Sequence, residues 1–516
     1  MEKVTGKCRH KLEDGEILTK DENEQSDQIS KLCNAIIHHI LSFLPVRDAA
    51  KTSILSKRWR KLFHSMPILD FDQKTGGALM THPNRALVDF MSASIFFREH
   101  APINLLRISL DYSSSFYFPI RQWIHISMKF NVLEMYLDFS GGDSFLQYRT
   151  LYVSDKLQAY YCADDNQVRW DYDSNTDESD SAEESDSESD ESSSSDSDDE
   201  SQNSRFIILP ALFNSGSLRV LKLAKCNIPD ADSMALGNLI CLVLRDVDIS
   251  EKMLHQMLSS CCMLENLELR LIPELKKLEF SAPKLLSMTL ECCHSLKKVS
   301  IDAQGLQYFK FGLSNTTKDL SLQVPSLVKA EIGLCHNINC NVRHRADRLV
   351  NLLKDLSHVK DLSLYSKFLN DMSIPKSQMK NFTMPTVRRF KIIGKMRNDT
   401  ISAMFGLVKA FDNLESLHLF IVHPSESDDV HLEEKQLRKL KSTSISCLES
   451  RLKELKVEGF EGTDIEIKLI KFLVDYCKVL AKVDIETYTP SFLTHGEIKA
   501  NLLNQWSSKD LEVNYN

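Results

Sequence analysis

A short hexamer recurs along the chain and constrains the fold more than any other feature. It has an aliphatic residue, two variable residues, an aliphatic, one variable residue and a last aliphatic. The last two aliphatics alternate with polar residues, so in a β-strand they would point into a core while their neighbours point outward. Copies begin at Leu105, Val132, Leu218, Leu239, Leu264, Leu275, Leu285, Leu296, Leu306, Leu327, Val359, Val387, Leu414, Leu452 and Leu480.

This pattern is typical of leucine-rich repeats, in which stacked copies form a parallel sheet. It predicts an irregular solenoid. Together with the helical segment 29–72 considered below, the expected fold class is α/β, a small three-helix segment followed by this solenoid. Parallel strands would lie on the concave face, with helices and loops outside. Between Leu264 and Leu306 the copies follow each other after only 10 or 11 residues, which leaves no room for a helix. We expect the chain to return there through short loops or 3₁₀ segments.

The outward strand positions define a candidate binding face. Either this face is a solvated surface of mixed charge, or it contacts a protein substrate, and the pattern does not distinguish the two. Glu279, Glu331 and His418 also occupy outward positions. The cationic positions are Lys222, Arg245, Arg270, Lys277, Lys298, Lys310, Lys329, Arg389 and Lys391.

The segment 29–72 is a second constraint, because it is short, helical in pattern and unusually apolar. Ile36, Ile37, Ile40, Leu41 and Leu44 form a broad apolar helix face. The proline that follows ends this helix, and two more short helices are expected after it. Three such helices cannot bury every apolar face among themselves, so we expect an external partner.

These two features together resemble a known family. The run "ILSFLPVRDAAKTSILSKRWRKLF", followed by "PILDFD", is similar to the F-box of plant F-box/leucine-rich-repeat proteins. The stretch 447–485, "CLESRLKELKVEGFEGTDIEIKLIKFLVDYCKVLAKVDI", resembles the FBD motif that closes many of them. The repeats "SLRVLKLAKCNI" and "LSSCCMLENLELR" fit the same family.

The resemblance implies a function that composition does not reveal. An F-box binds a Skp-type adaptor and, through it, a cullin–RING ubiquitin ligase, while the repeats present a protein substrate. One departure is visible, because "LCNA" stands at residues 32–35 where the family usually has Leu-Pro and acidic residues. We expect this change to weaken adaptor binding without abolishing it. By motif position, the adaptor-binding residues would be Leu32, Cys33, Ile36, Ile40, Leu41, Leu44, Pro45, Val46, Leu55 and Trp59.

The charge of the chain is distributed unevenly. The net charge is -9, but Asp171–Glu200 alone contains nine Asp and six Glu without a single Lys or Arg. Such a segment cannot bury enough apolar surface to fold, and we expect disorder. It would be either a solvated spacer or an electrostatic arm that contacts a basic partner or the concave face. The rest of the chain is too weakly basic to indicate nucleic-acid binding.

The motifs divide the chain into expected segments. Residues 1–25 would be a disordered N-terminus and 26–72 the F-box. The repeats would occupy 73–170 and 205–445, interrupted by the acidic insert at 171–204. Residues 446–516 would hold the FBD motif and a C-terminal cap.

No motif for catalysis, a cofactor or a metal is recognisable, and the 13 cysteines suggest reduced, buried thiols. The sequence shows neither a secretory leader nor a membrane span, which favours the nucleus or cytoplasm. We therefore expect a non-catalytic substrate receptor of a ubiquitin ligase, without cofactor or metal. The alternative is a repeat scaffold with a degenerate F-box that binds basic partners through its acidic insert.

Overall fold

The computed structural model describes residues 29, 31–72, 85–98, 101–140, 205–313, 316–334, 350–371, 382–422, 444–487 and 511–515. The chain forms two compact units, Met1–Met66 and Pro67–Asn516, and each is considered by itself. The acidic run Asp171–Glu200 and the N-terminal residues 1–25 lie outside the described residues.

The first unit is a small helical bundle. The proline that ends the first helix, Pro45, becomes the N-cap of the second, as its fixed φ allows. The Ser56 hydroxyl accepts a hydrogen bond from the Trp59 backbone N–H and so begins the third helix. The core of this first unit contains Ile37, Leu41, Ala49, Leu62 and Met66. The elements are α1 (Asn34–Ser42), α2 (Val46–Lys51), η1 (Thr52–Ile54) and α3 (Lys57–His64).

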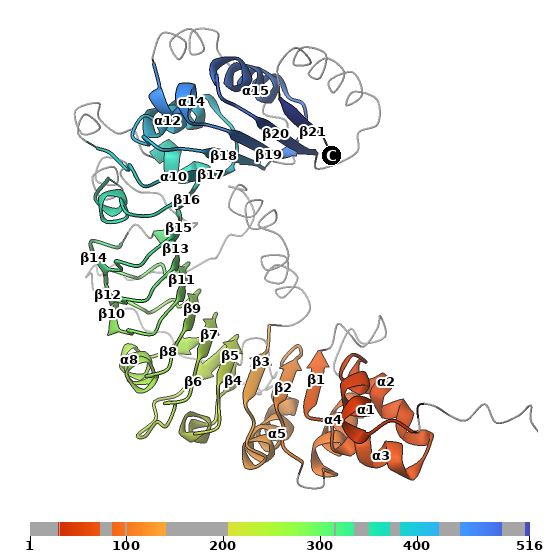
Figure 1. Cartoon of the computed structure of the whole chain (residues 1–516). Helices are drawn as coiled ribbons and strands as arrows, with labels where there is room; N and C mark the ends of the chain where they lie inside the picture. The colour runs from red at the N-terminus through yellow and green to blue at the C-terminus, as the bar shows by residue number, and fades with distance from the viewer. Residues whose placement is uncertain are drawn as a thin grey trace, which may run out of the picture. The chain divides into compact units, whose positions relative to one another are not determined.

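The second unit is built on one parallel sheet of 15 strands, which Figure 1 shows running from β1 to β21. Every recurring hexamer found in the sequence is a strand of this unit. Strands at its two ends, β1 and β21, lack a clear hexamer. The strands in spatial order are β1 (Ile68–Asp72), β2 (Leu105–Ser109), β3 (Glu134–Asp138), β5 (Val220–Ala224), β7 (Cys241–Arg245), β9 (Asn266–Arg270), β11 (Ser287–Glu291), β13 (Tyr308–Leu313), β15 (Lys329–Leu334), β16 (Asp361–Tyr365), β17 (Arg389–Gly394), β18 (Ser416–Ile421), β19 (Glu454–Phe460), β20 (Lys482–Thr487) and β21 (Glu512–Tyr515).

The strand register places equivalent residues of successive turns side by side. Leu267 of β9 lies opposite Met288 of β11, which lies opposite Phe309 of β13, and all three are buried. The second and fourth residues of each strand therefore stack into continuous apolar rows, as the hexamer pattern predicts.

Helices lie behind the sheet in both end regions of this unit. Trp123 of α5 is fully buried, and its indole N–H donates to the Ser92 hydroxyl of α4. Near the C-terminus, Thr463 and Glu466 form a capping box that begins α15. The helices are α4 (Arg85–Phe96), η2 (Ser114–Phe116), α5 (Tyr117–Lys129), η3 (Pro210–Asn214), α8 (Glu251–Ser260), α10 (Ser366–Asp371), α12 (Asn398–Val408), α14 (Ser446–Ser450) and α15 (Asp464–Tyr476).

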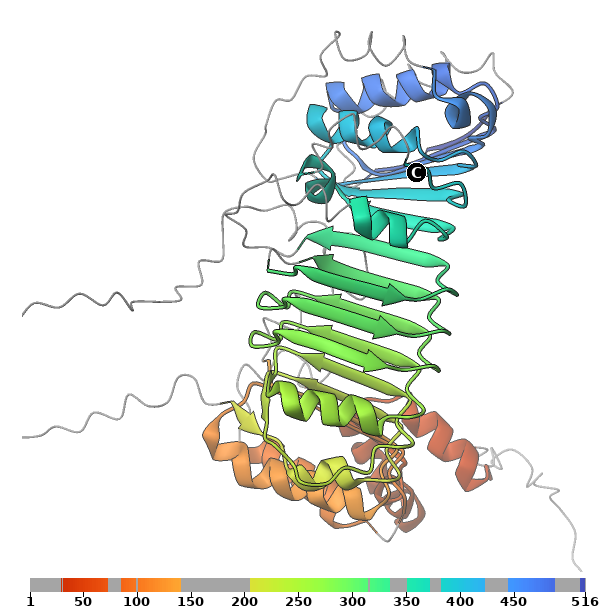
Figure 2. The ribbon, with the colours of Figure 1, turned by 90° about the vertical axis from the view of Figure 1, so that its left-hand side faces the viewer.

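The closely spaced hexamers have a different arrangement from the one expected. They alternate between two sheets. Copies beginning at Leu264, Leu285 and Leu306 enter the main sheet, whereas those at Leu275 and Leu296 form strands of an outer sheet. The prediction of loops or 3₁₀ segments there is wrong. The outer sheet contains β10 (Lys277–Ser281), β12 (Lys298–Asp302) and β14 (Asp319–Gln323), all parallel, and it faces the viewer in Figure 2.

Each full turn in this region is therefore one inner and one outer strand, repeating every 21 residues at Asn266, Ser287, Tyr308 and Lys329. Strand β14 escaped detection because Thr317 replaces the first aliphatic residue of its hexamer. The Thr317 side chain is buried, and its hydroxyl donates to the Leu296 carbonyl at 2.9 Å, which satisfies the polar atom.

A second outer sheet lies nearer the N-terminus and contains β4 (Phe206–Ile207), β6 (Cys226–Ile228) and β8 (Asp248–Ile249). At the ends of inner strands the chain turns through the left-handed region, with positive φ at Lys225, Asp246, Leu271 and Cys292. The predicted fold class is confirmed: a three-helix unit precedes a repeat domain with a long parallel sheet and helices and loops outside it. The outer strands are an addition.

Candidate binding surfaces

The first unit exposes several large apolar side chains. On α1 and its C-terminal end, Ile36, Ile40, Phe43 and Leu44 follow each other at helical spacing on one side. Phe43 is 75% exposed, and in η1 and just after it Ile54 is 83% and Leu55 68% exposed. We call this set the apolar surface: Ile36, Ile40, Phe43, Leu44, Ile54 and Leu55. Side chains of this size, left in water by a small unit, indicate a binding partner.

The structure divides the predicted adaptor-binding residues into two groups. Leu41, Val46 and Trp59 are buried in the core of the unit, and their contact with an adaptor stays a prediction. The apolar face of α1 is broad, so that one side of it packs into the core while the other side is exposed to solvent. Leu32 is half-buried, and the remaining members are exposed: Cys33, Ile36, Ile40, Leu44, Pro45 and Leu55. Sequence reasoning missed Phe43 and Ile54, the two most exposed members of the apolar surface.

The start of α1 shows the physical consequence of the "LCNA" sequence. Cys33 is the N-cap, but its side chain makes no capping hydrogen bond, and the first turn contains no acidic residue. Another contact replaces them. The Arg58 guanidinium from α3 donates to the Asn34 side-chain oxygen at 2.9 Å and to the Leu32 carbonyl. The helix start is therefore held by α3 instead of by its own cap.

Two adjacent histidines of α1, His38 and His39, contact other residues of the unit. His38 Nε2 lies 3.1 Å from the Leu62 carbonyl and 3.0 Å from the Ser65 hydroxyl. The His39 ring contacts Phe43 edge to face. No group of His, Cys, Asp or Glu among the described residues is arranged to hold a metal ion.

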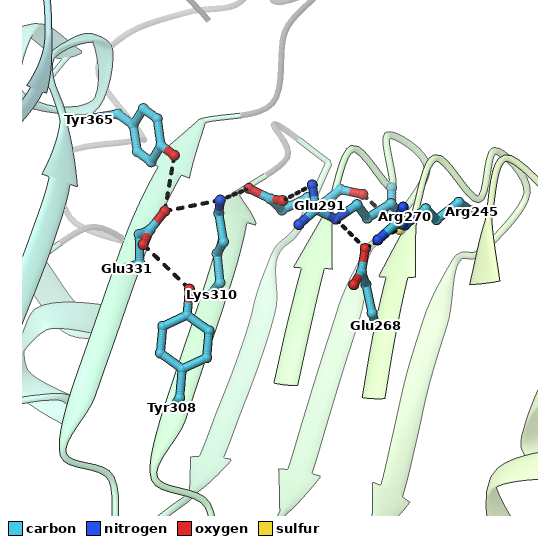
Figure 3. Close-up of polar contacts among 9 residues, drawn as sticks. Arg245, Glu268, Arg270, Glu291, Tyr308, Lys310, Glu331 and Tyr365 are labelled. Atoms are coloured by element: carbon cyan, nitrogen blue, oxygen red, sulfur yellow. Dashed lines mark hydrogen bonds and ion pairs between the residues drawn. The ribbon is translucent and has the colours of Figure 1, made fainter. Parts of the chain in front are cut away.

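On the main sheet, the central cations form ion pairs with carboxylates of their own or of neighbouring strands (Figure 3). Glu268 lies 2.7 Å from both Arg245 and Arg270, and Arg270 lies 3.1 Å from Glu291. Lys310 continues the series at 3.4 Å from Glu291 and 3.0 Å from Glu331. The Tyr365 hydroxyl donates to Glu331. We call this series the ionic chain: Arg245, Glu268, Arg270, Glu291, Lys310, Glu331 and Tyr365.

The ionic chain is neutral overall and largely withdrawn from solvent. The side chains of Lys310, Glu331 and Glu268 are only 6%, 7% and 10% exposed. Burial alone would lower the pKa of the Lys310 ammonium, but the carboxylates of Glu291 and Glu331 raise that pKa above its ordinary value. Lys310 is therefore charged, and its charge is compensated inside the protein.

Other predicted cations of the main sheet contact aromatic rings or an acid. Lys222, Lys329 and Lys391 place their ammonium groups 4.5, 5.2 and 4.9 Å from the ring centroids of Tyr136, Tyr308 and Phe420, respectively. Arg389 forms two hydrogen bonds of 2.7 Å to Asp361, although its side chain stays 67% exposed.

Two predicted members of this face do not belong to it. Lys277 and Lys298 lie on the outer sheet, because their hexamers are outer strands, so the expected single cationic face is wrong for them. Glu279, also expected on the main sheet, lies beside them and forms an ion pair with Lys298 at 2.7 Å.

Two features of the main sheet had no sequence signal that we recognised. Near the C-terminus, Glu458 lies 2.5 Å from Lys456 and 3.4 Å from His418. Burial would raise the pKa of the Glu458 carboxyl, but these two partners lower it to about 2. Next to this cluster, four apolar side chains are buried together, although the odd-numbered residues of these strands point outward. Tyr365, Ile393 and Phe420 are the fifth residues of β16, β17 and β18, and Val422 directly follows β18.

The described cysteines fit the expectation of free thiols, several of them buried. Burial raises the pKa of Cys261 and Cys447 to about 11 and that of Cys293 to about 12, which keeps these thiols protonated and unreactive. Within the described ranges, no helix is long and apolar enough to cross a membrane.

Comparisons with known proteins agree with this architecture. A family model of the F-box domain matches residues 29–71, and the model of the At1g61320/AtMIF1 LRR domain matches residues 207–507. The chain is 23% identical to a putative F-box/FBD/LRR-repeat protein of Arabidopsis thaliana, with 92% of each chain covered. A second protein with this description, from the same organism, is 25% identical over 87% of this chain and 81% of its own. An Arabidopsis F-box/LRR-repeat protein is 59% identical over 46 residues, 9% of each chain.

Proposed function

Because the chain belongs to the plant F-box proteins with a leucine-rich-repeat domain, we propose that it is a substrate receptor of an SCF-type (Skp–cullin–F-box) ubiquitin ligase. In this proposal the first unit docks on a Skp-type adaptor, which connects it to the cullin–RING ligase. The repeat domain binds a protein substrate and holds it for ubiquitination. The chain itself supplies position and no catalytic group or cofactor.

The observation that carries the proposal is the apolar surface of the first unit. A buried aliphatic or aromatic side chain of this size contributes roughly 1.5–3 kcal/mol. Several of them left exposed on one small unit favour a partner with an apolar groove. Ile36, Ile40 and Leu44 supply one side of α1 for that contact, and Phe43, Ile54 and Leu55 extend the set.

The candidate substrate contacts on the main sheet also divide into accessible and withdrawn side chains. Lys222, Lys329, Arg389 and Lys391 remain on the main sheet as candidate contacts. Arg245, Arg270 and Lys310 are withdrawn into the ionic chain and would have to break ion pairs to bind a substrate. We infer that the C-terminal half of the main sheet, from β15 to β19, offers the more accessible charges. The proposed compartment is the nucleus, the cytoplasm or both.

The test is co-purification with a Skp-type adaptor. We expect the intact chain to form a complex, and a Leu44→Asp, Ile54→Asp double variant to lose it. Both positions are exposed, so the variant should keep its fold. Leu41 is unsuitable for this purpose because it is only 1% exposed, and a charge there would unfold the unit.

The matched control is Val328→Asp, Val479→Asp, which introduces the same two charges at exposed apolar positions of the repeat domain. This control should retain the adaptor. If the intact chain captures no adaptor, the ligase proposal is contradicted, and the scaffold alternative with a degenerate F-box replaces it.

The helix start allows a finer test of the same proposal. Cys33 has φ −69°, which a proline adopts without strain, and a first-turn acid would favour the helix dipole. A Cys33→Pro, Ala35→Glu variant should therefore bind the adaptor several-fold more tightly, because α1 is better ordered before binding. Unchanged affinity would show that the contacts of Arg58 already compensate fully.

A further inference from the structure

The outer sheet presents a row of lysines that stack one turn apart. Lys297 N–H donates to the Lys276 carbonyl at 2.7 Å, and Lys318 N–H donates to the Lys297 carbonyl at 2.8 Å. These three residues therefore occupy equivalent places on adjacent turns, roughly 5 Å apart. All three are exposed, and Lys277 is exposed beside them. We call Lys276, Lys297 and Lys318 the lysine row; each directly precedes a strand of the outer sheet, β10, β12 or β14.

No ion pair within the described residues neutralises this row. Lys298, one residue further along, is paired with Glu279, and Asp319 also lies close to it. Glu251 of α8 is near, but its carboxylate accepts hydrogen bonds from the backbone N–H groups of Lys276 and Lys277. The ammonium groups of the row thus face solvent. Like charges stacked on adjacent strands destabilise a sheet, so this arrangement favours an anionic ligand.

The same chain contains a segment of opposite charge and sufficient reach. Asp171–Glu200 holds fifteen carboxylates and no cation. The chain enters the outer side of the repeat domain at β4, which pairs with β6 and, through it, with β8. Helix α8 follows and lies against β10. Three turns separate β4 from β10, about 15 Å, while thirty extended residues reach about 100 Å.

We propose that the lysine row is the docking surface for the acidic segment of this chain, residues Asp171–Glu200. The contact is electrostatic and tolerant of register, since many carboxylates can meet three stacked ammonium groups. It keeps the acidic segment on the outer side and away from the main sheet, whose central cations are already paired. The proposal goes beyond the ligase function and does not depend on adaptor binding.

The experiment uses a fluorescein-labelled peptide with the sequence of residues 171–200 as the probe. It is titrated into the full chain and into a chain that lacks these residues. Covalent connection gives the segment an effective concentration near the millimolar range. The deletion chain should therefore bind the probe at least tenfold more tightly than the full chain, and added salt should weaken this binding.

The surface is tested by a Lys276→Gln, Lys297→Gln, Lys318→Gln variant of the deletion chain. Three lost ion pairs should weaken the probe about tenfold. The matched control is Lys360→Gln, Lys409→Gln, Lys453→Gln, which removes the same charge from exposed positions elsewhere in the repeat domain. The control should change affinity less than twofold. Equal weakening by both triple variants would overturn the proposal, because attraction would then depend on net charge alone.

A second measurement needs no substitution. Acetylation rates of the lysines, followed by peptide mass spectrometry, should be several-fold lower at Lys276, Lys297 and Lys318 in the full chain than in the deletion chain. Lys409 should react equally in both. Equal rates at the row, or equal probe affinity for the full and deletion chains, would show that the acidic segment is not the occupant. If the probe affinity still fell in the triple lysine variant, the occupant of the lysine row would be an acidic segment of another protein.

Discussion

The two faces of the central turns carry similar cations in different surroundings, ion-paired and buried on the main sheet and exposed to solvent on the outer sheet. On the main sheet, Lys310 stands between carboxylates of the two strands beside it, and Arg270 pairs with one carboxylate of its own strand and one of the next; their side chains are 6% and 12% exposed. On the outer sheet, Lys297 stands between two other lysines and faces solvent. Both faces come from the same 21-residue turns. The comparison shows that the charge of a repeat position says little until its neighbours one turn away are known, because those neighbours decide whether it is neutralised.

The largest expected effect is a break in the ionic chain. Lys310→Ala would leave Glu291 and Glu331 buried without their shared cation, which should lower the free energy of unfolding by about 3–5 kcal/mol. Lys297→Ala on the outer sheet should stay within about 0.5 kcal/mol of the wild type. Urea unfolding followed by circular dichroism measures both. Similar losses in the two variants would remove the distinction between the faces.

The strands were predictable from the sequence, but their sheets were not. The hexamers at Leu264 and Leu275 satisfy the same local pattern, although one enters the main sheet and the other the outer sheet. The alternation of apolar and polar residues within one hexamer predicts which side chains are buried, but it does not predict which strand pairs with it. The 21-residue period does contain it, and an alignment at that period would have separated Lys277 and Lys298 from the main-sheet cations.

The candidate sites were predictable to a similar degree. The apolar excess of residues 29–72 correctly indicated a helical unit with exposed hydrophobic side chains. Helical spacing alone could not show that Leu41 faces the core while Leu44 faces solvent, because both lie within the broad apolar stripe. The pairing of Arg245 with Glu268, 23 residues away, depends on register across strands and was out of reach.

A smaller effect is expected from the close packing of the main sheet. A Cβ at Gly333 would lie 3.0 Å from the Tyr365 ring, whose hydroxyl binds Glu331 at the end of the ionic chain. Gly333→Ala should therefore displace the ring and cost about 1–3 kcal/mol. Gly406→Ala is the control, since no atom apart from the adjoining helix backbone lies within 4 Å of a Cβ there, and α12 should gain about 0.5–1 kcal/mol. Differential scanning calorimetry would compare the two, and an unchanged stability of Gly333→Ala would show that the Tyr365 ring can move away at no cost.

The acid stability of the repeat domain should depend on Glu458. Its pKa is near 2 in the folded chain against 4.5 when unpaired, so its contribution is complete above pH 4.5 and is lost as the pH falls through 2. After allowance for solvent screening, we expect about 1–2 kcal/mol. Glu458→Gln should lower stability at pH 6 by this amount, and the unfolding curves of the variant and the wild type should converge near pH 2. A constant difference at all pH values would assign the effect to packing.

The smallest effect is expected at the corners that lead from inner to outer strands. Lys225 has φ 51°, which costs an ordinary residue about 1–2 kcal/mol, whereas Asn tolerates this conformation better. Lys225→Asn should therefore raise the free energy of unfolding by about 0.5–1 kcal/mol. Lys360→Asn removes the same charge at a position without positive φ and should bring no gain. A gain in both variants would point to relief of charge repulsion. A gain at Lys225 alone would show that the turn between the two faces is itself strained.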